Sequence, residues 1–286
     1  MDYEIGRVSR TGNREDNQDR LAALETEHGV LLALADGMGG QHGGALAAQT
    51  LIDTVSAELA HYALPVPQPQ QFLTQLLTRA HQAVHAAGRA AQPPLDPGTT
   101  AVLCLIQNGT ATWAHVGDSR LYLFRKDLAL YRTRDHSYVE ELYRAGKLTL
   151  ARRQGHPMRN YVTQCVGLQR SIPKFSLSRE VALEPGDVLL LCSDGLWEPL
   201  DDAQLGTLLA EGDLDQSLNR LGERAEEASW PRSDNISALA IRIRRLAEPA
   251  DLEAAEAAER AGEDRLSDAI EEIERTLRQY EHEMKN

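Results

Sequence analysis

The chain has 286 residues, which is long enough for one large domain with an appendage or for two small domains, and its hydrophobic fraction of 42% argues against general disorder. Its formal net charge of −13 argues against DNA or RNA as a partner, because an acidic surface repels a phosphate backbone. No apolar run approaches the roughly 20 residues that span a bilayer, and the N-terminus lacks signal-peptide features. The three cysteines show no paired spacing that would indicate disulfides. We therefore expect a cytoplasmic protein without a membrane span.

The first 245 residues alternate short apolar runs with glycine-marked turns and amphipathic stretches. Strands are predicted at Val30–Ala35, Thr100–Ile106, Ala111–Val116, Leu121–Phe124, Val188–Cys192 and Ile236–Ile243. Helices are predicted at Gly44–His61, Gln71–Ala90, Tyr138–Ala145 and Ala203–Ala228. The turns at Asn108-Gly109 and Gly117-Asp118-Ser119 are too short for a crossover, so the strands that they join must be antiparallel. The pattern predicts an α+β fold with an antiparallel core and helices outside it.

The composition changes from Leu246 onward, where 13 acidic residues stand against 5 basic ones and Ala, Glu and Arg dominate. This predicts an acidic helical tail over residues 246–286. Its apolar residues have heptad spacing: Leu266, Ile270, Ile273, Leu277, Tyr280 and Met284. Three roles stay open for this short seam, namely packing in cis on the rest of the chain, dimerisation as a coiled coil, and docking to another protein.

Four aspartates fall at the ends of predicted strands. Asp36 and Asp194 follow strands, Asp118 lies in a turn between two strands, and Asp234 precedes the last strand. Each alone is typical of a turn. If the strand ends converge, however, the carboxylates repel one another and need a cation. Oxygen ligands beside glycines suit Mg²⁺ or Mn²⁺, whereas the scattered histidines do not suggest a zinc site.

Seven short motifs occur in a fixed order: Gly12-Asn13-Arg14-Glu15-Asp16-Asn17-Gln18-Asp19, Ala35-Asp36-Gly37-Met38-Gly39-Gly40, Gly98-Thr99-Thr100, Gly117-Asp118-Ser119-Arg120, Asp135-His136-Ser137, Ser193-Asp194-Gly195-Leu196 and Asp234-Asn235. The ordered set resembles the bacterial branch of the metal-dependent PPM (type 2C) protein serine/threonine phosphatases. The likeness spans about residues 3–245. It implies a four-layer αββα sandwich, in which two antiparallel sheets are flanked by helices, as the catalytic domain over residues 1–245.

The resemblance also implies roles for individual residues. Its metal-binding set is Asp19, Asp36, Gly37, Asp118, Asp194 and Asp234, with Arg14 as the group that grips the substrate phosphate. Asp36 would bridge two Mn²⁺ or Mg²⁺ ions, while Asp118 with Asp194 would form a third, weaker site. A water between two such ions has a lowered pKa and can attack phosphorus, so that no protein nucleophile is needed.

Two positions depart from the family pattern. Many members carry Glu immediately before the position of Asp19, where this chain has Gln18, whose amide adds no negative charge. We therefore expect weaker binding of the first metal, with Gln18 in the metal shell. Eukaryotic members often have a proposed proton donor, His, where this chain has Met38, so protonation of the leaving group would fall to a metal-bound water.

The segment from about residue 138 to 167 resembles the mobile flap beside the family's active site. From its residues alone it is a helix followed by a long polar loop. Its cationic side chains could steer a phosphorylated peptide or simply be solvated: Arg144, Lys147, Arg152, Arg153 and Arg159.

Two functions from different classes remain in view. The first is an enzyme that removes phosphate from serine and threonine side chains of proteins and reverses a Ser/Thr kinase in bacterial signalling. The alternative is a catalytically weak phosphoprotein-binding regulatory module that acts through its helical tail. The presence of Asp36, Asp194 and Asp234 favours the enzyme.

Overall fold

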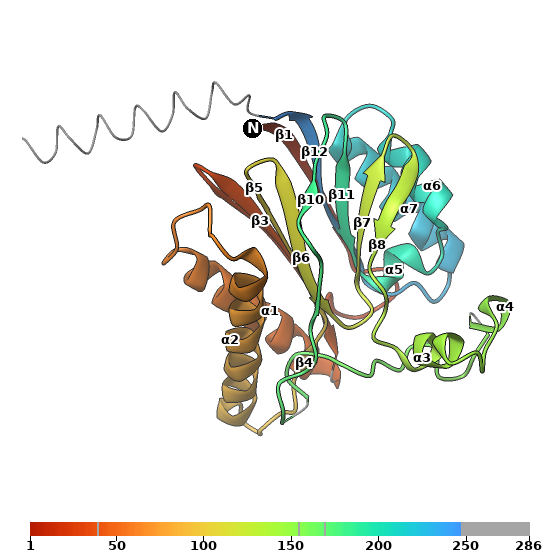
Figure 1. The fold of residues 1–286 in the computed structure, drawn as a ribbon. Coiled ribbons are helices and arrows are strands. Elements are labelled where there is room, and N and C mark those ends of the chain that lie inside the picture. Colours follow the sequence, from red (N-terminus) through yellow and green to blue (C-terminus); the bar gives the residue numbers. More distant parts are fainter. Residues whose placement is uncertain (39, 154, 169, 247–286) are drawn as a thin grey trace, which may run out of the picture. The chain divides into compact units, whose positions relative to one another are not determined.

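The computed structural model describes residues 1–38, 40–153, 155–168 and 170–246 (Figure 1). Met1–Arg245 forms one compact unit. The predicted tail and its heptad seam lie outside the described residues, apart from Leu246.

The compact unit contains two antiparallel sheets. The first sheet has the strand order β1 (Asp2–Arg10), β12 (Ile236–Arg245), β11 (Val188–Cys192), β7 (Arg120–Arg125) and β8 (Leu128–Arg132). The second sheet has the order β10 (Val181–Ala182), β6 (Thr110–Val116), β5 (Ala101–Gln107), β3 (Gly29–Met38) and β2 (Asp19–Thr26). Two further strands extend the second sheet, since β4 (Gly98–Thr99) pairs with β3 and β9 (Ser176–Leu177) pairs with β6.

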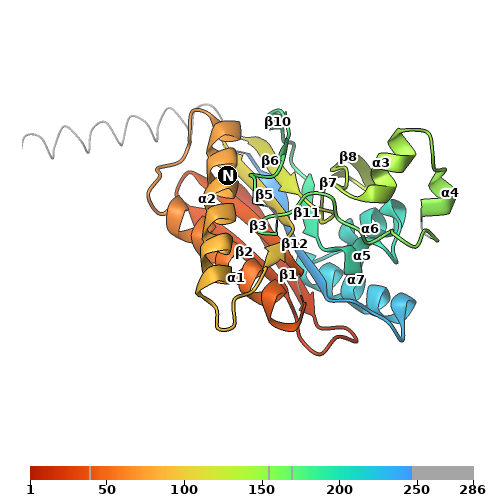
Figure 2. The same cartoon turned by 90° about the horizontal axis from the view of Figure 1, so that it is seen from below.

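Helices cover the outer face of each sheet, and the two inner faces pack together (Figures 1 and 2). The second sheet carries α1 (Gly40–Leu59) and α2 (Pro69–Ala90). The first carries α5 (Asp194–Trp197), α6 (Asp202–Leu209) and α7 (Leu214–Ser229). Alternate residues of β3 pack on the helices, Leu31 and Ala33 among them, whereas Leu32 and Leu34 are fully buried outside that cluster and face the other sheet. The four-layer αββα sandwich is therefore confirmed.

Two short helices lie beyond the sandwich, at the end where β4 is found (Figure 1). They are α3 (Tyr138–Arg144) and α4 (Leu150–Arg153), and both belong to the segment that resembles a flap. Backbone bridges tie the two ends of this segment to the unit, because Ser137 pairs with Val162 and Val166 pairs with Thr99.

The predicted single helix over Ala203–Ala228 is wrong, because the structure has two helices there. Leu209 ends α6, and Gly212 then takes a φ of 56°, a left-handed conformation that glycine adopts without steric cost. The side chain of Asp213 accepts a hydrogen bond from the Gln216 amide at 3.1 Å and caps a new helix. Strands β1, β2 and β8 are further elements that the apolar-run pattern did not predict.

The described part of the chain contains no helix that is both long and apolar enough to cross a membrane.

The core beneath α1 and α2 gives a test of the packing. Leu103 in β5 is fully buried, so we expect Leu103→Ala to lower the free energy of unfolding by about 2–5 kcal/mol, measured by urea denaturation. Leu128→Ala in β8 is the matched control, because that side chain is 65% exposed and its loss should cost less than about 0.5 kcal/mol. Equal losses for the two variants would contradict the layer assignment.

Candidate active site

The antiparallel pairing of β2 with β3 brings two acidic residues together. Asp36 follows the buried stretch of β3, and the register places it opposite Asp19, the first residue of β2. Asp19 is 3% exposed, and its Oδ2 accepts a hydrogen bond of 2.9 Å from the Ser193 hydroxyl at the end of β11. Ser193 directly follows β11 of the first sheet, so this bond joins the two sheets at the level of the aspartates.

The residue after Asp36 has to be small. A Cβ on Gly37 would lie 2.3 Å from the Gly44 carbonyl oxygen and 2.8 Å from the Gln18 carbonyl oxygen. The end of β3 is also fixed by Thr100, whose amide donates to the Asp36 carbonyl at 2.9 Å and whose hydroxyl lies 2.7 Å from the Ser119 hydroxyl. These contacts hold Asp36 next to the turn that carries Asp118.

The first sheet supplies two further aspartates. Asp194 begins α5 directly after Ser193, and Asp234 precedes β12. The two segments approach closely, because a Cβ on Gly195 would lie 2.1 Å from the Asn235 carbonyl oxygen. Glycine is therefore required beside Asp194 for the helix start to sit against the strand start.

These strand ends surround one cleft of about 780 Å³. Its acidic and amide lining includes Asp36, Asp118, Asp194, Asp234 and Gln18. Arg14, Gly37 and Met38 also line it, as do Asn160, Tyr161 and Val162 from the segment that resembles a flap. Four of the aspartates singled out from the sequence thus share one cavity, and Asp19 is buried next to Asp36.

The carboxylates raise one another's pKa. Burial raises the pKa of Asp36 well above its usual value, and the charges of Asp19, Asp194, Asp118 and Asp234 raise it further. Burial is also the largest cause for Asp19, whose pKa rises to about 6. For Asp118, burial and then the charge of Asp135 raise the pKa to about 7. Without a cation, the cluster therefore holds protons that ordinary surface aspartates would have lost.

The donor set fits a hard divalent cation. Asp19 Oδ1 is buried and accepts no hydrogen bond from the described residues, so a carboxylate oxygen lacks a positive partner. Within residues 1–38, 40–153, 155–168 and 170–246, no group of three or more His, Cys, Asp or Glu side chains lies close enough together to form a closed metal site. The acidic groups instead form an open cluster, in which backbone carbonyls and water can supply the remaining ligands.

Arg14 lies at the edge of this cleft. Its Nη2 donates to Asp234 Oδ2 at 2.6 Å, and the two side chains are 59% and 34% exposed. The guanidinium therefore sits beside the acidic cluster and remains open to solvent. Such a planar cation can bind two oxygens of a phosphate, although here one donor is engaged by Asp234.

Asn235 has a structural role that the sequence reasoning did not assign. Its Nδ2 donates to the backbone carbonyls of Thr11 and Asp16, and its Oδ1 accepts a hydrogen bond of 2.9 Å from the backbone N–H of Gln18. One amide side chain thus holds the loop that carries Arg14 against the start of β12. The Asp234-Asn235 dipeptide was the available signal, but only a structure shows what an asparagine contacts.

Histidine and cysteine do not contribute to the cluster. The rings of His115 and His136 stack 4.8 Å apart, and burial lowers the pKa of both, that of His136 to about 4. Burial raises the pKa of the Cys165 thiol to about 11, so it is no thiolate nucleophile at neutral pH. Cys104, Cys165 and Cys192 are all free and buried.

The family model for protein phosphatase 2C matches residues 8–238, which include the cleft residues named above. The chain belongs to the protein phosphatase 2C family. Protein phosphatase PhpP of Streptococcus pneumoniae is 31% identical over 230 residues, which cover 78% of this chain and 92% of PhpP. Serine/threonine protein phosphatase PstP of Mycobacterium tuberculosis is 33% identical over 229 residues, which cover 78% of this chain and 41% of PstP. The resemblance to the bacterial PPM branch is thus confirmed.

Solved structures of phosphatases have the same fold. The serine/threonine phosphatase of S. agalactiae superposes with a TM-score of 0.78 at 29% identity, covering 85% of this chain and 100% of that one. The catalytic domain of PstP in complex with 2 manganese ions gives a TM-score of 0.71 at 27% identity, covering 85% of this chain and 99% of that one. Metal dependence is therefore a property of the family to which this chain belongs.

The acidic cluster should lower the stability of the metal-free protein. At pH 7 in chelator we expect Asp36→Asn to raise the free energy of unfolding by on the order of 1 kcal/mol, because the neutral amide removes a carboxylate whose pKa folding raises. Asp135→Asn is the control: Asp135 is a buried aspartate paired with Arg120, and its loss should cost about 3 kcal/mol. Urea denaturation measures both, and destabilisation by Asp36→Asn would contradict the repulsion argument.

Proposed function

We propose that this phosphatase hydrolyses phosphoserine and phosphothreonine on proteins, with two Mn²⁺ or Mg²⁺ ions held by the acidic cluster. The observation that carries the proposal is the group of aspartates that share one cleft and raise one another's pKa, in a chain of the protein phosphatase 2C family. The manganese-bound PstP domain supports Mn²⁺ in particular.

The residues have distinct proposed roles. Asp36 would hold both ions, together with the Gly37 carbonyl for one of them and with Asp194 and Asp234 for the other. Asp19 would act nearby through bound water, and Asp118 with Asp194 would hold a third, weaker ion. Once bound, the ions supply an activated water and offset the negative charge that develops on the phosphoryl group.

Arg14 orients the substrate in this proposal. Its exposed guanidinium donates to Asp234 at the edge of the cleft and can bind phosphate oxygens with its other N–H groups. Asn235 supports it by holding the loop over residues 11–18. No cysteine or histidine nucleophile is required, in keeping with the buried thiols and the shifted histidine pKa values.

The wider assignment is also a proposal. Residues 1–245 would be the catalytic domain, with residues 138–167 as its flap, in a cytoplasmic protein whose substrates are phosphoproteins and which opposes a Ser/Thr kinase. The tail over residues 246–286 keeps its three open roles, packing in cis, dimerising or docking a partner. The alternative of a catalytically weak binding module is not favoured by relatives that are named protein phosphatases.

A phosphothreonine peptide tests the reaction. We expect phosphate release with Mn²⁺ or Mg²⁺ and none in chelator, and we expect Asp36→Asn to lower kcat/KM by about 100-fold or more, because the bridging carboxylate is lost. Asp127→Asn is the matched control, since Asp127 lies exposed in the turn between β7 and β8. Phosphate release that persists in chelator would overturn the metal mechanism.

Gln18 tests the charge balance of the metal site. The variant Gln18→Glu adds a negative charge to the lining of the cleft, so Mn²⁺ should bind about threefold more tightly or better in calorimetric titration. The same charge should destabilise the metal-free protein by adding to the repulsion. Gln92→Glu, at an exposed position between α2 and β4, should change neither quantity, and weaker Mn²⁺ binding by Gln18→Glu would refute the role of Gln18 in the metal shell.

A further inference from the structure

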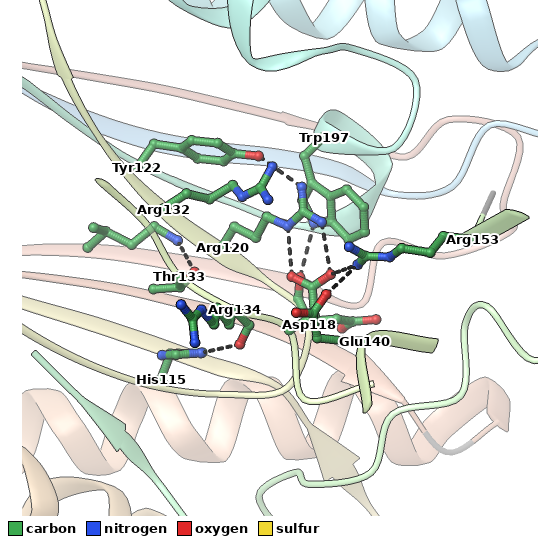
Figure 3. A network of polar contacts seen from close by, with 12 residues as sticks. His115, Asp118, Arg120, Tyr122, Arg132, Thr133, Arg134, Glu140, Arg153 and Trp197 are labelled. Carbon is green, nitrogen blue, oxygen red and sulfur yellow. Dashed lines mark hydrogen bonds and ion pairs between the residues drawn. The ribbon is translucent and has the colours of Figure 1, made fainter. Parts of the chain in front are cut away.

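A buried ionic network lies between the catalytic cleft and the short helices of the flap (Figure 3). At its centre the Arg120 Nε and Nη2 each donate to one oxygen of Asp135 at 2.8 Å. The Arg120 and Asp135 side chains are 8% and 4% exposed, so this bidentate pair is nearly removed from water. The two hydrogen bonds thus fix the Asp135 carboxylate to Arg120 of β7.

Arg153 of α4, in the flap, contacts the same Asp135 carboxylate. Its Nη2 lies 3.3 Å from Asp135 Oδ2 and 2.8 Å from Glu140 Oε2, where Glu140 belongs to α3. The Arg153 and Glu140 side chains are 14% and 12% exposed. One guanidinium thus holds both flap helices to a carboxylate that β7 already fixes through Arg120.

Apolar packing does little to hold α4 in place. The helix has four residues, none of them buried, and Leu150 is 63% exposed. A cavity of about 970 Å³ separates it from the α5–α6 region and is lined by Leu150, Arg153, Trp197 and Leu200, among others. The ion pairs of Arg153 therefore carry a large share of the attachment of α4 to the domain.

The other end of the network reaches the catalytic cleft. The guanidinium carbon of Arg120 lies 3.4 Å from the centre of the Trp197 ring, and the Trp197 indole nitrogen donates to the Asp118 carbonyl at 3.0 Å. Asp118 lines both the cavity beside α4 and the catalytic cleft. Direct contacts thus lead from the flap to the turn that carries Asp118.

We propose that Arg153 is a positioning residue that, through Asp135, Arg120 and Trp197, ties the placement of the flap to the turn that carries Asp118. Arg153 contacts no residue of the acidic cluster in the described chain, so it acts through the network and not on the phosphate. Its loss would leave the Glu140 and Asp135 carboxylates buried with one cation fewer, which drives α3 and α4 toward solvent.

Hydrogen exchange of the full chain in chelator tests the attachment without relying on activity. In Arg153→Ala we expect the amides of residues 138–153 to exchange about tenfold faster, the factor expected for losing a charge-assisted hydrogen bond. Arg152→Ala removes the same charge from an exposed neighbour and should change exchange by less than about twofold. Arg153→Lys should fall between the two, because an ammonium lacks the fork that reaches both carboxylates.

Two exchange results would overturn the proposal. Equal exchange in Arg153→Ala and Arg152→Ala would show that the ion pairs do not hold the flap. Faster exchange spread through β3 and β5 as well would show that Arg153 stabilises the whole unit and does not position the flap.

The link to Asp118 rests on the proposed function and needs a kinetic cycle. We expect Arg153→Ala to raise KM for a phosphothreonine peptide about tenfold, with kcat for a small phosphoester changed less than about twofold. Trp197→Phe keeps a ring beneath Arg120 but removes the hydrogen bond to Asp118, and its effect on KM should be non-additive with Arg153→Ala by about threefold or more. Additive effects on KM in active variants would contradict the proposed link between Arg153 and the Asp118 turn. Inactivity of the unmodified chain would refute the proposed function, but it would not affect the conclusion from hydrogen exchange.

Discussion

The candidate site depends on acidic side chains that lie buried or half-buried where the two sheets meet. Asp19 and Asp36 face each other across β2 and β3, and Asp194 and Asp234 approach from the first sheet. Burial and mutual repulsion raise the pKa of Asp36 well above its usual value. The fold therefore holds carboxylates close together, and binding of protons or divalent cations lowers their electrostatic repulsion. This repulsion is the physical basis of the proposed metal site.

The surrounding contacts keep that arrangement from relaxing. Ser193 bonds Asp19 across the two sheets, and the Thr100 hydroxyl bonds Ser119 beside the Asp118 turn. Asp135 lies outside the cluster and is also buried, but Arg120 neutralises its charge through two hydrogen bonds. Asp135 is thus paired with an arginine, whereas the buried Oδ1 of Asp19 accepts no hydrogen bond from the described residues.

Much of this was predictable from the sequence, because continuous apolar runs such as Val188–Cys192 mark buried strands and an aspartate at the end of such a run is conspicuous. Strands β1 and β2 escaped prediction because they are only partly buried and carry charged residues, so their pairing depends on tertiary contacts. The break between α6 and α7 could have been read from Gly212-Asp213, a left-handed glycine followed by a helix cap. The pairing of Arg153 with Asp135 and Glu140 had no local signal, because the partners come from separate elements.

The most direct test of the account is the number of protons released when Mn²⁺ binds to the full chain. Calorimetric titrations at pH 6 in buffers of different ionisation enthalpy measure this number. Because the pKa of Asp19 is about 6 and that of Asp118 about 7, binding should expel about one proton or more at pH 6 and progressively fewer as the pH rises toward 8. Mn²⁺ binding that releases no proton at pH 6 would contradict the claim that the buried aspartates exchange protons for metal.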